Sequence, residues 1–277
     1  MQNAALAALK LNWRYLAFDV HPDHLGPAIA GAKAMRFIGL NLTVPHKLLA
    51  IDLVDVADER AKFWGAVNTI AFETRDASGA WVRLGAAGQG PFEEVRSHGF
   101  NTDANAIIQS LKEDFAWPDL RGASVLLLGA GGAARSAALR LAEEGISSLF
   151  ILNRTAENAR KLADEVTKRF PGTKVVQGYP NEPVDLVLNS TSLGLKPEDA
   201  LPMDLAWLQS RRPTRVYDMI YRPHETALLR AARAAGCHVA NGLGMLLYQG
   251  AEALRLWTGA TPPVEIMRAA LENHIHV

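Results

Sequence analysis

The sequence predicts an α/β protein of two domains. Short apolar segments alternate with longer amphipathic ones along the 277 residues, a pattern typical of strands connected by helices. A glycine-rich turn, Gly129 to Ser136, stands between one such strand and the helix that follows it. The stretch from Pro118 to Gly122 resembles a domain boundary, and the chain is long enough for two ordinary domains.

The composition is that of an ordinary globular protein, with 49% hydrophobic and 21% charged residues. The formal net charge is zero, so we expect no nucleic-acid partner and no anionic membrane partner. No apolar run is long enough to cross a bilayer, and the first residues lack the pattern of a signal peptide. Cys237 is the only cysteine, which excludes an internal disulfide and a cysteine metal site. We expect a cytoplasmic protein without a metal.

The first part of the chain is predicted to mix helices and strands. Pro45 fixes φ and disfavours helix at Val44, so a turn is expected before the next helix. Asp76 to Gly79 has the residues of a hairpin turn. The pattern predicts helices over 1–11, 28–36, 47–56 and 103–114 and strands over 13–20, 37–42, 66–72 and 81–84.

Gly85 to Ser97 contains three glycines and a proline. Little apolar content is available to anchor it. We expect a surface loop that donates no catalytic group, and its replacement by a short turn should preserve activity within a few-fold.

Strands that alternate with helices along the chain predict mostly parallel sheets for the protein. In the second part of the chain, the strands are expected over 124–128, 149–152, 174–177, 186–189, 216–219 and 238–240. The helices are expected over 132–144, 162–170, 225–235, 242–258 and from 262 onward.

A strand, a glycine turn, a helix and a second strand form the dinucleotide-binding unit of this region. Glycine allows the backbone to turn tightly and to approach a pyrophosphate, and the helix N-terminus offers free N–H groups to the phosphates. The second strand ends in Asn153-Arg154-Thr155. An acidic residue there would bind the 2′-hydroxyl of NAD, whereas Arg154 suits a 2′-phosphate. The expected cofactor is therefore NADP.

Polar motifs follow several predicted strands outside this unit. Asn41-Leu-Thr-Val-Pro-His-Lys47 lies at a strand end, where ligands bind in open α/β sheets. Gly65-Ala-Val-Asn-Thr69 and Gly99-Phe-Asn-Thr-Asp103 repeat an Asn-Thr pair. Taken singly, Lys47 is more typical of a solvated surface lysine, and each Asn-Thr pair is more typical of a turn or a helix cap.

Together these motifs resemble those of the shikimate dehydrogenase family across essentially the whole chain. The remaining matching motifs are Gly129-Ala-Gly-Gly-Ala-Ala-Arg135, Asn153-Arg-Thr155, Asn189-Ser-Thr-Ser-Leu-Gly194 and Asn241-Gly-Leu-Gly-Met245, with Gln249 beyond them. The resemblance implies the reversible reduction of 3-dehydroshikimate to shikimate with NADPH. It also implies an N-terminal α/β substrate domain, a Rossmann-type NADP-binding domain and a cleft between them.

The resemblance assigns roles to individual residues. Lys47 and Asp103 would form the catalytic pair, with Lys47 transferring the proton and Asp103 orienting it and the substrate. The expected substrate contacts are Thr43, Asn68, Tyr221 and Gln249. The expected cofactor contacts are Gly129, Ala130, Gly131, Gly132, Ala133, Asn153, Arg154, Thr155, Met219 and Gly242.

The expected domains are residues 1–104, completed by the C-terminal helices 241–277, and residues 105–240. The partner is a small molecule, and the protein is expected to be a monomer or a homodimer. Two alternatives stay open: an NAD-dependent quinate/shikimate dehydrogenase, and a non-catalytic NADP-binding relic.

Two features depart from the family pattern. The family begins with a strand and a Ser-x-Ser loop that holds the substrate carboxylate, whereas Met1 begins inside the following helix. We therefore expect the 277 residues to be a shortened version of a longer active enzyme. The 277 residues should bind NADP but turn over shikimate poorly or not at all. The second feature is the longer connection at Gly85 to Ser97.

Overall fold

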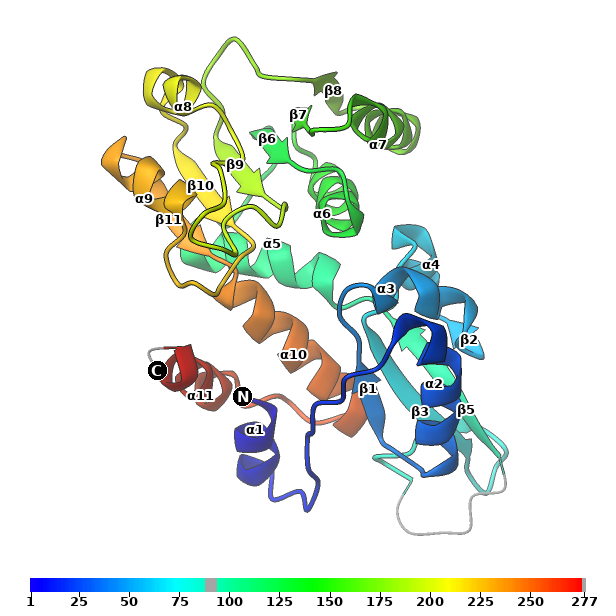
Figure 1. Cartoon of the computed structure of the whole chain (residues 1–277). Helices are drawn as coiled ribbons and strands as arrows, with labels where there is room; N and C mark the ends of the chain where they lie inside the picture. The colour runs from blue at the N-terminus through cyan, green and yellow to red at the C-terminus, as the bar shows by residue number, and fades with distance from the viewer. Residues whose placement is uncertain (88–93, 276–277) are drawn as a thin grey trace. The chain divides into compact units, whose positions relative to one another are not determined.

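The computed structural model describes residues 1–87 and 94–275 of the chain (Figure 1). It consists of two compact units. Unit 1 comprises Met1–Asp103 and Leu247–Val277, and unit 2 comprises Ala104–Leu246. Each unit combines helices with a β-sheet, which confirms the predicted α/β class. The assignment of one unit to the substrate and the other to the cofactor stays a prediction.

Unit 1 contains a five-stranded sheet in the order β1-β3-β5-β2, with β4 paired to β3. Strand β3 is antiparallel to β1, β4 and β5, and only β2 and β5 run parallel. The expectation of mostly parallel sheets is therefore wrong for this unit. The short turn between β3 and β4 can join only antiparallel strands. The strands are β1 (Gly39–Asn41), β2 (Val56–Ala57), β3 (Thr69–Arg75), β4 (Trp81–Arg83) and β5 (Val95–Phe100).

Helices pack apolar residues against this sheet and against one another. Leu25 and Ile29 of α2 share a core with Ile70 and Phe72 of β3. A second core joins the first helix to the C-terminal helices, around Leu6 and other apolar side chains. The α-helices of unit 1 are α1 (Gln2–Ala8), α2 (Leu25–Ala34), α3 (His46–Leu49), α4 (Glu59–Trp64), the end of α10 (Leu243–Thr258) and α11 (Val264–Ile275). Two 3₁₀ turns cover Pro22–His24 and Ala50–Asp52.

Several local expectations for this unit are wrong. The segment 13–20 is no strand, because the Asn3 side chain bonds both the backbone N–H and the carbonyl of Tyr15 in place of a neighbouring strand. The helix expected over 47–56 ends at Leu49 and continues only as a 3₁₀ turn. Val95 to Ser97 belong to β5 rather than to a loop. Residues 88–93 of the expected loop lie outside the described residues.

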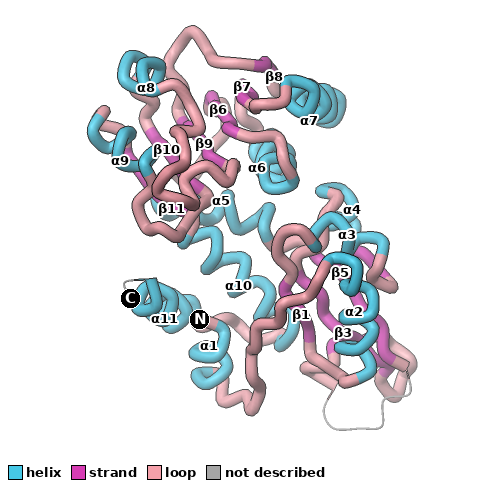
Figure 2. The backbone as a smooth tube through the Cα atoms, viewed as in Figure 1, coloured by secondary structure: helices cyan, strands magenta, loops and turns pink. Residues whose placement is uncertain are grey.

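Unit 2 contains six parallel strands in the order β11-β10-β9-β6-β7-β8, as predicted for this region (Figure 2). The chain runs outward from β6 in one direction and from β9 in the other, so the strand order reverses between them. In open α/β sheets, ligands bind at this switch point, beyond the carboxyl ends of the strands. The strands are β6 (Ser124–Leu128), β7 (Ser148–Leu152), β8 (Lys174–Gln177), β9 (Leu186–Asn189), β10 (Arg215–Asp218) and β11 (His238–Asn241).

Helices connect these strands, as Figures 1 and 2 show. Helix α8 was not predicted; it begins where the Asp204 side chain accepts a hydrogen bond from Ala206 N–H. The α-helices of unit 2 are α5 (Asp103–Asp114), α6 (Gly132–Glu143), α7 (Ala156–Arg169), α8 (Leu205–Arg211), α9 (Ala227–Ala234) and the beginning of α10. Within the described ranges, no helix is both long enough and apolar enough to traverse a bilayer.

Candidate active site

Lys47 and Asp103 form a hydrogen-bonded ion pair in unit 1. The Lys47 ammonium Nζ donates to Asp103 Oδ2 at 2.7 Å, across 56 positions of sequence. Lys47 lies in α3, just after the turn that ends β1, and Asp103 is the first residue of α5, just after β5. Strand β3 pairs with both β1 and β5, and its first residue, Thr69, is the partner of Asn41 and of Phe100. The carboxyl ends of β1 and β5 therefore lie at the same end of the sheet.

Asn68 holds the second oxygen of the Asp103 carboxylate. Its amide Nδ2 donates to Asp103 Oδ1 at 2.9 Å and to Thr102 Oγ1 at 3.0 Å. Its carbonyl Oδ1 accepts from the Thr102 backbone N–H at 2.7 Å. Asn68 is only 1% exposed, and hydrogen bonds at both Nδ2 and Oδ1 fix the orientation of its amide. The Asp103 carboxylate is therefore oriented by one cation and one neutral donor.

Gln249 of α10 lies beside this group, because its Oε1 is 3.5 Å from Asn68 Nδ2. Thr43 lies between β1 and α3, four residues before Lys47, and is exposed. The structure thus brings Lys47, Asp103, Asn68 and Gln249 into one polar cluster. Tyr221, the remaining predicted substrate contact, belongs to unit 2 and is 39% exposed.

Thr102, which was not predicted as a site residue, completes this cluster. Its side chain is almost fully buried, and its hydroxyl lies 3.3 Å from Thr69 Oγ1. Thr69 in turn accepts from Asn41 Nδ2 at 3.0 Å. The signal was present in the two Asn-Thr pairs, which the antiparallel pairing of β3 and β5 places side by side.

The glycine-rich turn of unit 2 has the features that a pyrophosphate site requires. Gly129 has φ of 108°, and a Cβ there would lie 2.7 Å from Ser190 Oγ. Helix α6 begins at Gly132 without a side-chain cap, and Gly131 has open space around the position of a Cβ. The first N–H groups of α6 are thus left for an anion.

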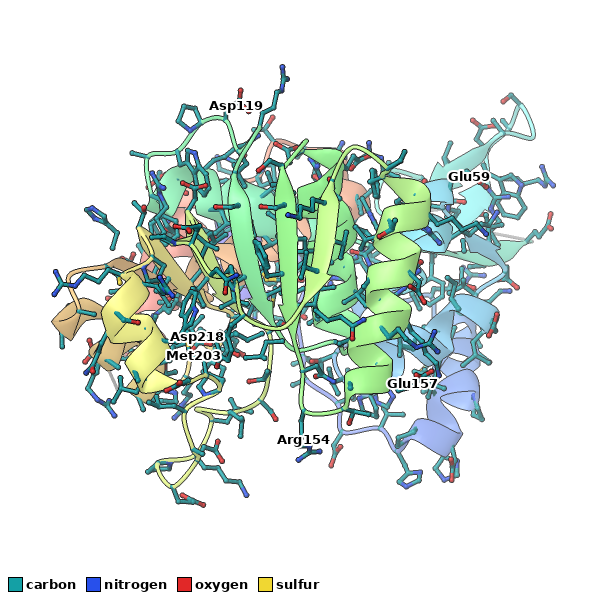
Figure 3. All side chains as sticks on the ribbon, turned by 90° about the horizontal axis from the view of Figure 1, so that it is seen from above. Glu59, Asp119, Arg154, Glu157, Met203 and Asp218 are labelled. Atoms are coloured by element: carbon teal, nitrogen blue, oxygen red, sulfur yellow. The ribbon has the colours of Figure 1, made fainter. Side chains whose placement is uncertain are left out.

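The end of β7 presents a cation and no acidic residue. Asn153 Nδ2 donates to the carbonyl of Thr155 at 2.8 Å and shapes the turn. Arg154 is exposed and extends away from the end of the sheet (Figure 3). A guanidinium held there suits a 2′-phosphate, so the residues present fit NADP.

Met219 and Gly242 approach each other closely beyond β10 and β11. The Met219 N–H donates to the carbonyl of Asn189 at 2.9 Å, and the Gly242 N–H donates to that of Ile220 at 3.2 Å. A Cβ on Gly242 would collide with the Met219 carbonyl. Only glycine fits at this position.

Comparisons with known proteins agree with this architecture. Residues 1–70 match a family model described as the shikimate dehydrogenase substrate binding domain, and residues 110–192 match one described as shikimate / quinate 5-dehydrogenase. Residues 242–272 match the shikimate 5'-dehydrogenase C-terminal domain. Shikimate dehydrogenase (NADP(+)) of Moorella thermoacetica is 43% identical over 284 aligned positions, covering 99% of this chain and 87% of that protein. The chain belongs to the shikimate dehydrogenase family.

Solved structures of similar length share the fold. The structure of shikimate 5-dehydrogenase from Thermus thermophilus in complex with NADP(H) and shikimate has a TM-score of 0.79 and 33% identity, covering 98% of this chain and 92% of that one. The ligand-free 5-ketofructose reductase of Gluconobacter sp. strain CHM43 has a TM-score of 0.78 and 32% identity, covering 98% and 91%. Proteins of this fold therefore act on more than one substrate.

Proposed function

We propose that this protein catalyses the reversible NADPH-dependent reduction of 3-dehydroshikimate to shikimate, a step of aromatic amino acid biosynthesis. The observation that carries the proposal is the Lys47–Asp103 pair at 2.7 Å, held by Asn68. Membership of a family whose curated relatives are NADP(+)-dependent shikimate dehydrogenases supports it. Unit 1 would bind the substrate, and unit 2 would bind the cofactor.

The residues of unit 1 suit proton transfer to a reacting oxygen. The ammonium of Lys47 donates a proton to the alkoxide that develops as the carbonyl is reduced. Asp103 keeps Lys47 in place through Oδ2, while Asn68 keeps Asp103 in place through Oδ1. Thr43, Gln249 and Tyr221 bear groups that both donate and accept, as a polyol substrate requires. Asn68 bears an amide of the same kind, but its two N–H groups already donate to Asp103 and Thr102.

NADPH, when bound, supplies the hydride. Arg154 would pair with its 2′-phosphate, and the first N–H groups of α6 would bind its pyrophosphate. The other residues proposed to contact it are Gly129, Ala130, Gly131, Gly132, Ala133, Asn153, Thr155, Met219 and Gly242.

Steady-state assays with paired substrates and cofactors test the proposal. We expect the highest kcat/KM for shikimate with NADP. Preference for quinate with NAD would favour the quinate/shikimate alternative, and faster reduction of 5-ketofructose would overturn the assigned substrate. NADP binding without any turnover would favour the non-catalytic alternative.

We also propose that the enzyme works in the cytoplasm as a monomer or a homodimer, with no nucleic-acid or membrane partner. Its balanced charge supports the last point. Light scattering on the purified protein measures the oligomeric state, and a tetramer or larger assembly would contradict this prediction.

A further inference from the structure

Asn189 and Asp218 stand side by side at the carboxyl ends of β9 and β10. The two residues are paired in the register of these parallel strands, and both are 0% exposed. Their side chains are hydrogen-bonded, with Asn189 Nδ2 donating to Asp218 Oδ1 at 2.9 Å. Figure 3 shows Asp218 within unit 2. A carboxylate buried so completely is costly unless its hydrogen bonds are satisfied.

Two further donors complete the surroundings of the Asp218 carboxylate. The Ile220 backbone N–H donates to Oδ1 at 3.1 Å, and the Thr226 hydroxyl donates to Oδ2 at 2.7 Å. Burial raises the pKa of Asp218, and the hydrogen bonds from Thr226, Ile220 and Asn189 oppose that rise. We name Asn189, Asp218 and Thr226 the Asp218 cluster.

Hydrogen bonds of the Asp218 cluster connect the loop after β9 with the loop after β10. Asn189 Oδ1 accepts from both the N–H and the hydroxyl of Thr191, at 3.0 and 2.8 Å. Thr226 Oγ1 accepts from Leu229 N–H at 3.3 Å and so caps α9. One continuous series of hydrogen bonds thus runs from the loop after β9, through Asp218, to the start of α9.

The loop held in this way, residues 219–226, carries Met219 and Tyr221. It lies on the β9-β10-β11 half of the sheet, whereas the glycine turn and Arg154 follow β6 and β7 on the other half. A dinucleotide bound across the switch point places one nucleotide on each half. With the 2′-phosphate at Arg154, the nicotinamide half falls on the side of the Asp218 cluster.

We propose that Asp218 is a positioning residue for the nicotinamide half of the cofactor site. It acts through Thr226, Asn189 and the Ile220 N–H, which hold the loop of Met219 and Tyr221 in one conformation. This inference rests on the proposed function, because it takes NADPH as the ligand.

Binding of two ligands to the full chain tests the inference. NADPH requires both halves of the site, whereas adenosine 2′,5′-bisphosphate requires only the half near Arg154. We expect Asp218→Ala to raise the Kd of NADPH at least tenfold and to leave that of adenosine 2′,5′-bisphosphate within twofold. It should also lower kcat/KM for shikimate on the order of 100-fold, because small misplacements of reacting groups have effects of that size.

Asp218→Asn should restore most of the binding and activity. Its Oδ1 can keep the bonds from Asn189 and Ile220, and its Nδ2 can donate to Thr226 once that hydroxyl rotates. Thr226→Val removes the hydroxyl at nearly constant shape. It should also raise the Kd of NADPH selectively, by a smaller factor than Asp218→Ala does. If Asp218→Ala does not fold, the two Kd values of Thr226→Val test the inference instead.

Asp185→Ala is the matched control. Asp185 also ties two segments of the same sheet, since its Oδ2 accepts from the N–H and hydroxyl of Ser124 at 2.8 and 2.9 Å. It lies at the amino ends of the strands, so its loss should leave the ratio of the two Kd values unchanged.

The outcomes separate the inference from the proposed function. Equal weakening of both ligands by Asp218→Ala or Thr226→Val, or no weakening of either, overturns the inference alone. A wild-type protein that binds no NADPH overturns the proposed function and the inference together. If the wild-type protein binds NADPH but does not turn over shikimate, the proposed function fails. The Kd values of NADPH and adenosine 2′,5′-bisphosphate still test the role of Asp218.

Discussion

At the scale of the residue, the pair of Lys47 and Asp103 carries the proposed chemistry. Removal of the ammonium group in Lys47→Ala should lower turnover by roughly 10²–10⁴-fold, the usual contribution of one positioned acid or base. NADP affinity should barely change, because Lys47 lies in unit 1, away in sequence from the glycine turn. Steady-state kinetics and an NADPH fluorescence titration measure the two effects. Near-normal turnover in the variant would remove Lys47 from the proton-transfer step.

Arg154 is the residue on which the choice of cofactor depends. Arg154→Ala should weaken NADP binding by about 1.5–3 kcal/mol, the range of a charge-assisted hydrogen bond, and leave NAD binding nearly unchanged. Arg160 in α7 provides a control, since it is already paired with Glu157 and Asp164. Calorimetric titration with both cofactors separates the outcomes, and an equal loss for NADP and NAD would mean that Arg154 is structural.

At the scale of the element, the start of α10 depends on the absence of a side chain at Gly242. A Cβ there collides with the Met219 carbonyl, so Gly242→Ala must shift either the helix or the loop after β10. We expect a loss of about 1–3 kcal/mol in the free energy of unfolding, as for overpacked sites, together with weaker NADPH binding.

Gly172→Ala is the control for this prediction, because a Cβ at Gly172 meets nothing within 4 Å. Its effect should stay within about 0.5 kcal/mol. Urea denaturation followed by far-UV circular dichroism measures both variants, and a Gly242→Ala protein as stable as wild type would show that the loop adapts without cost.

At the scale of the whole molecule, a charged cluster on β3, β4 and β5 makes stability depend on pH. Glu73 is 5% exposed and interacts with Arg83, with Arg96 at 2.7 Å and with His98 at 3.1 Å. Burial raises the pKa of Glu73, but the hydrogen bonds of His98 and Arg96 and the charge of Arg83 outweigh it and lower the pKa to about 2.

A carboxyl group whose pKa is lowered in the folded state stabilises that state above its ordinary pKa. The stabilisation is fully present at neutral pH and is lost as the pH falls from about 4.5 toward 2. Glu73→Gln should therefore cost up to about 3 kcal/mol at pH 7, and the difference from wild type should shrink through that window. Denaturant unfolding at a series of pH values measures it.

The exposed Glu94, which pairs with Arg75, provides the control. Glu94→Gln should change the free energy of unfolding by less than about 1 kcal/mol at every pH. A constant difference between wild type and Glu73→Gln from pH 7 to 2 would contradict the assigned role of the Glu73 charge.

The sequence alone determined those features of the protein that depend on residues close together in the chain. The glycine turn and its flanking strand and helix were predictable, because a tight turn and a helix N-terminus need particular residues at fixed spacing. The parallel sheet of unit 2 followed from strands that alternate with helices. The motifs around Lys47 and Asp103 indicated the family, which the comparisons confirmed.

The tertiary structure decided what depends on partners distant in sequence. Periodicity could not show that Tyr15 would bond to the side chain of Asn3 rather than join a sheet. Nor could it show that Thr102 would be buried against Asn68, because strand pairing is set by contacts across the fold. The same holds for Asp218, an acidic residue at a strand end. Only the folded chain places three hydrogen-bond donors around its buried carboxylate.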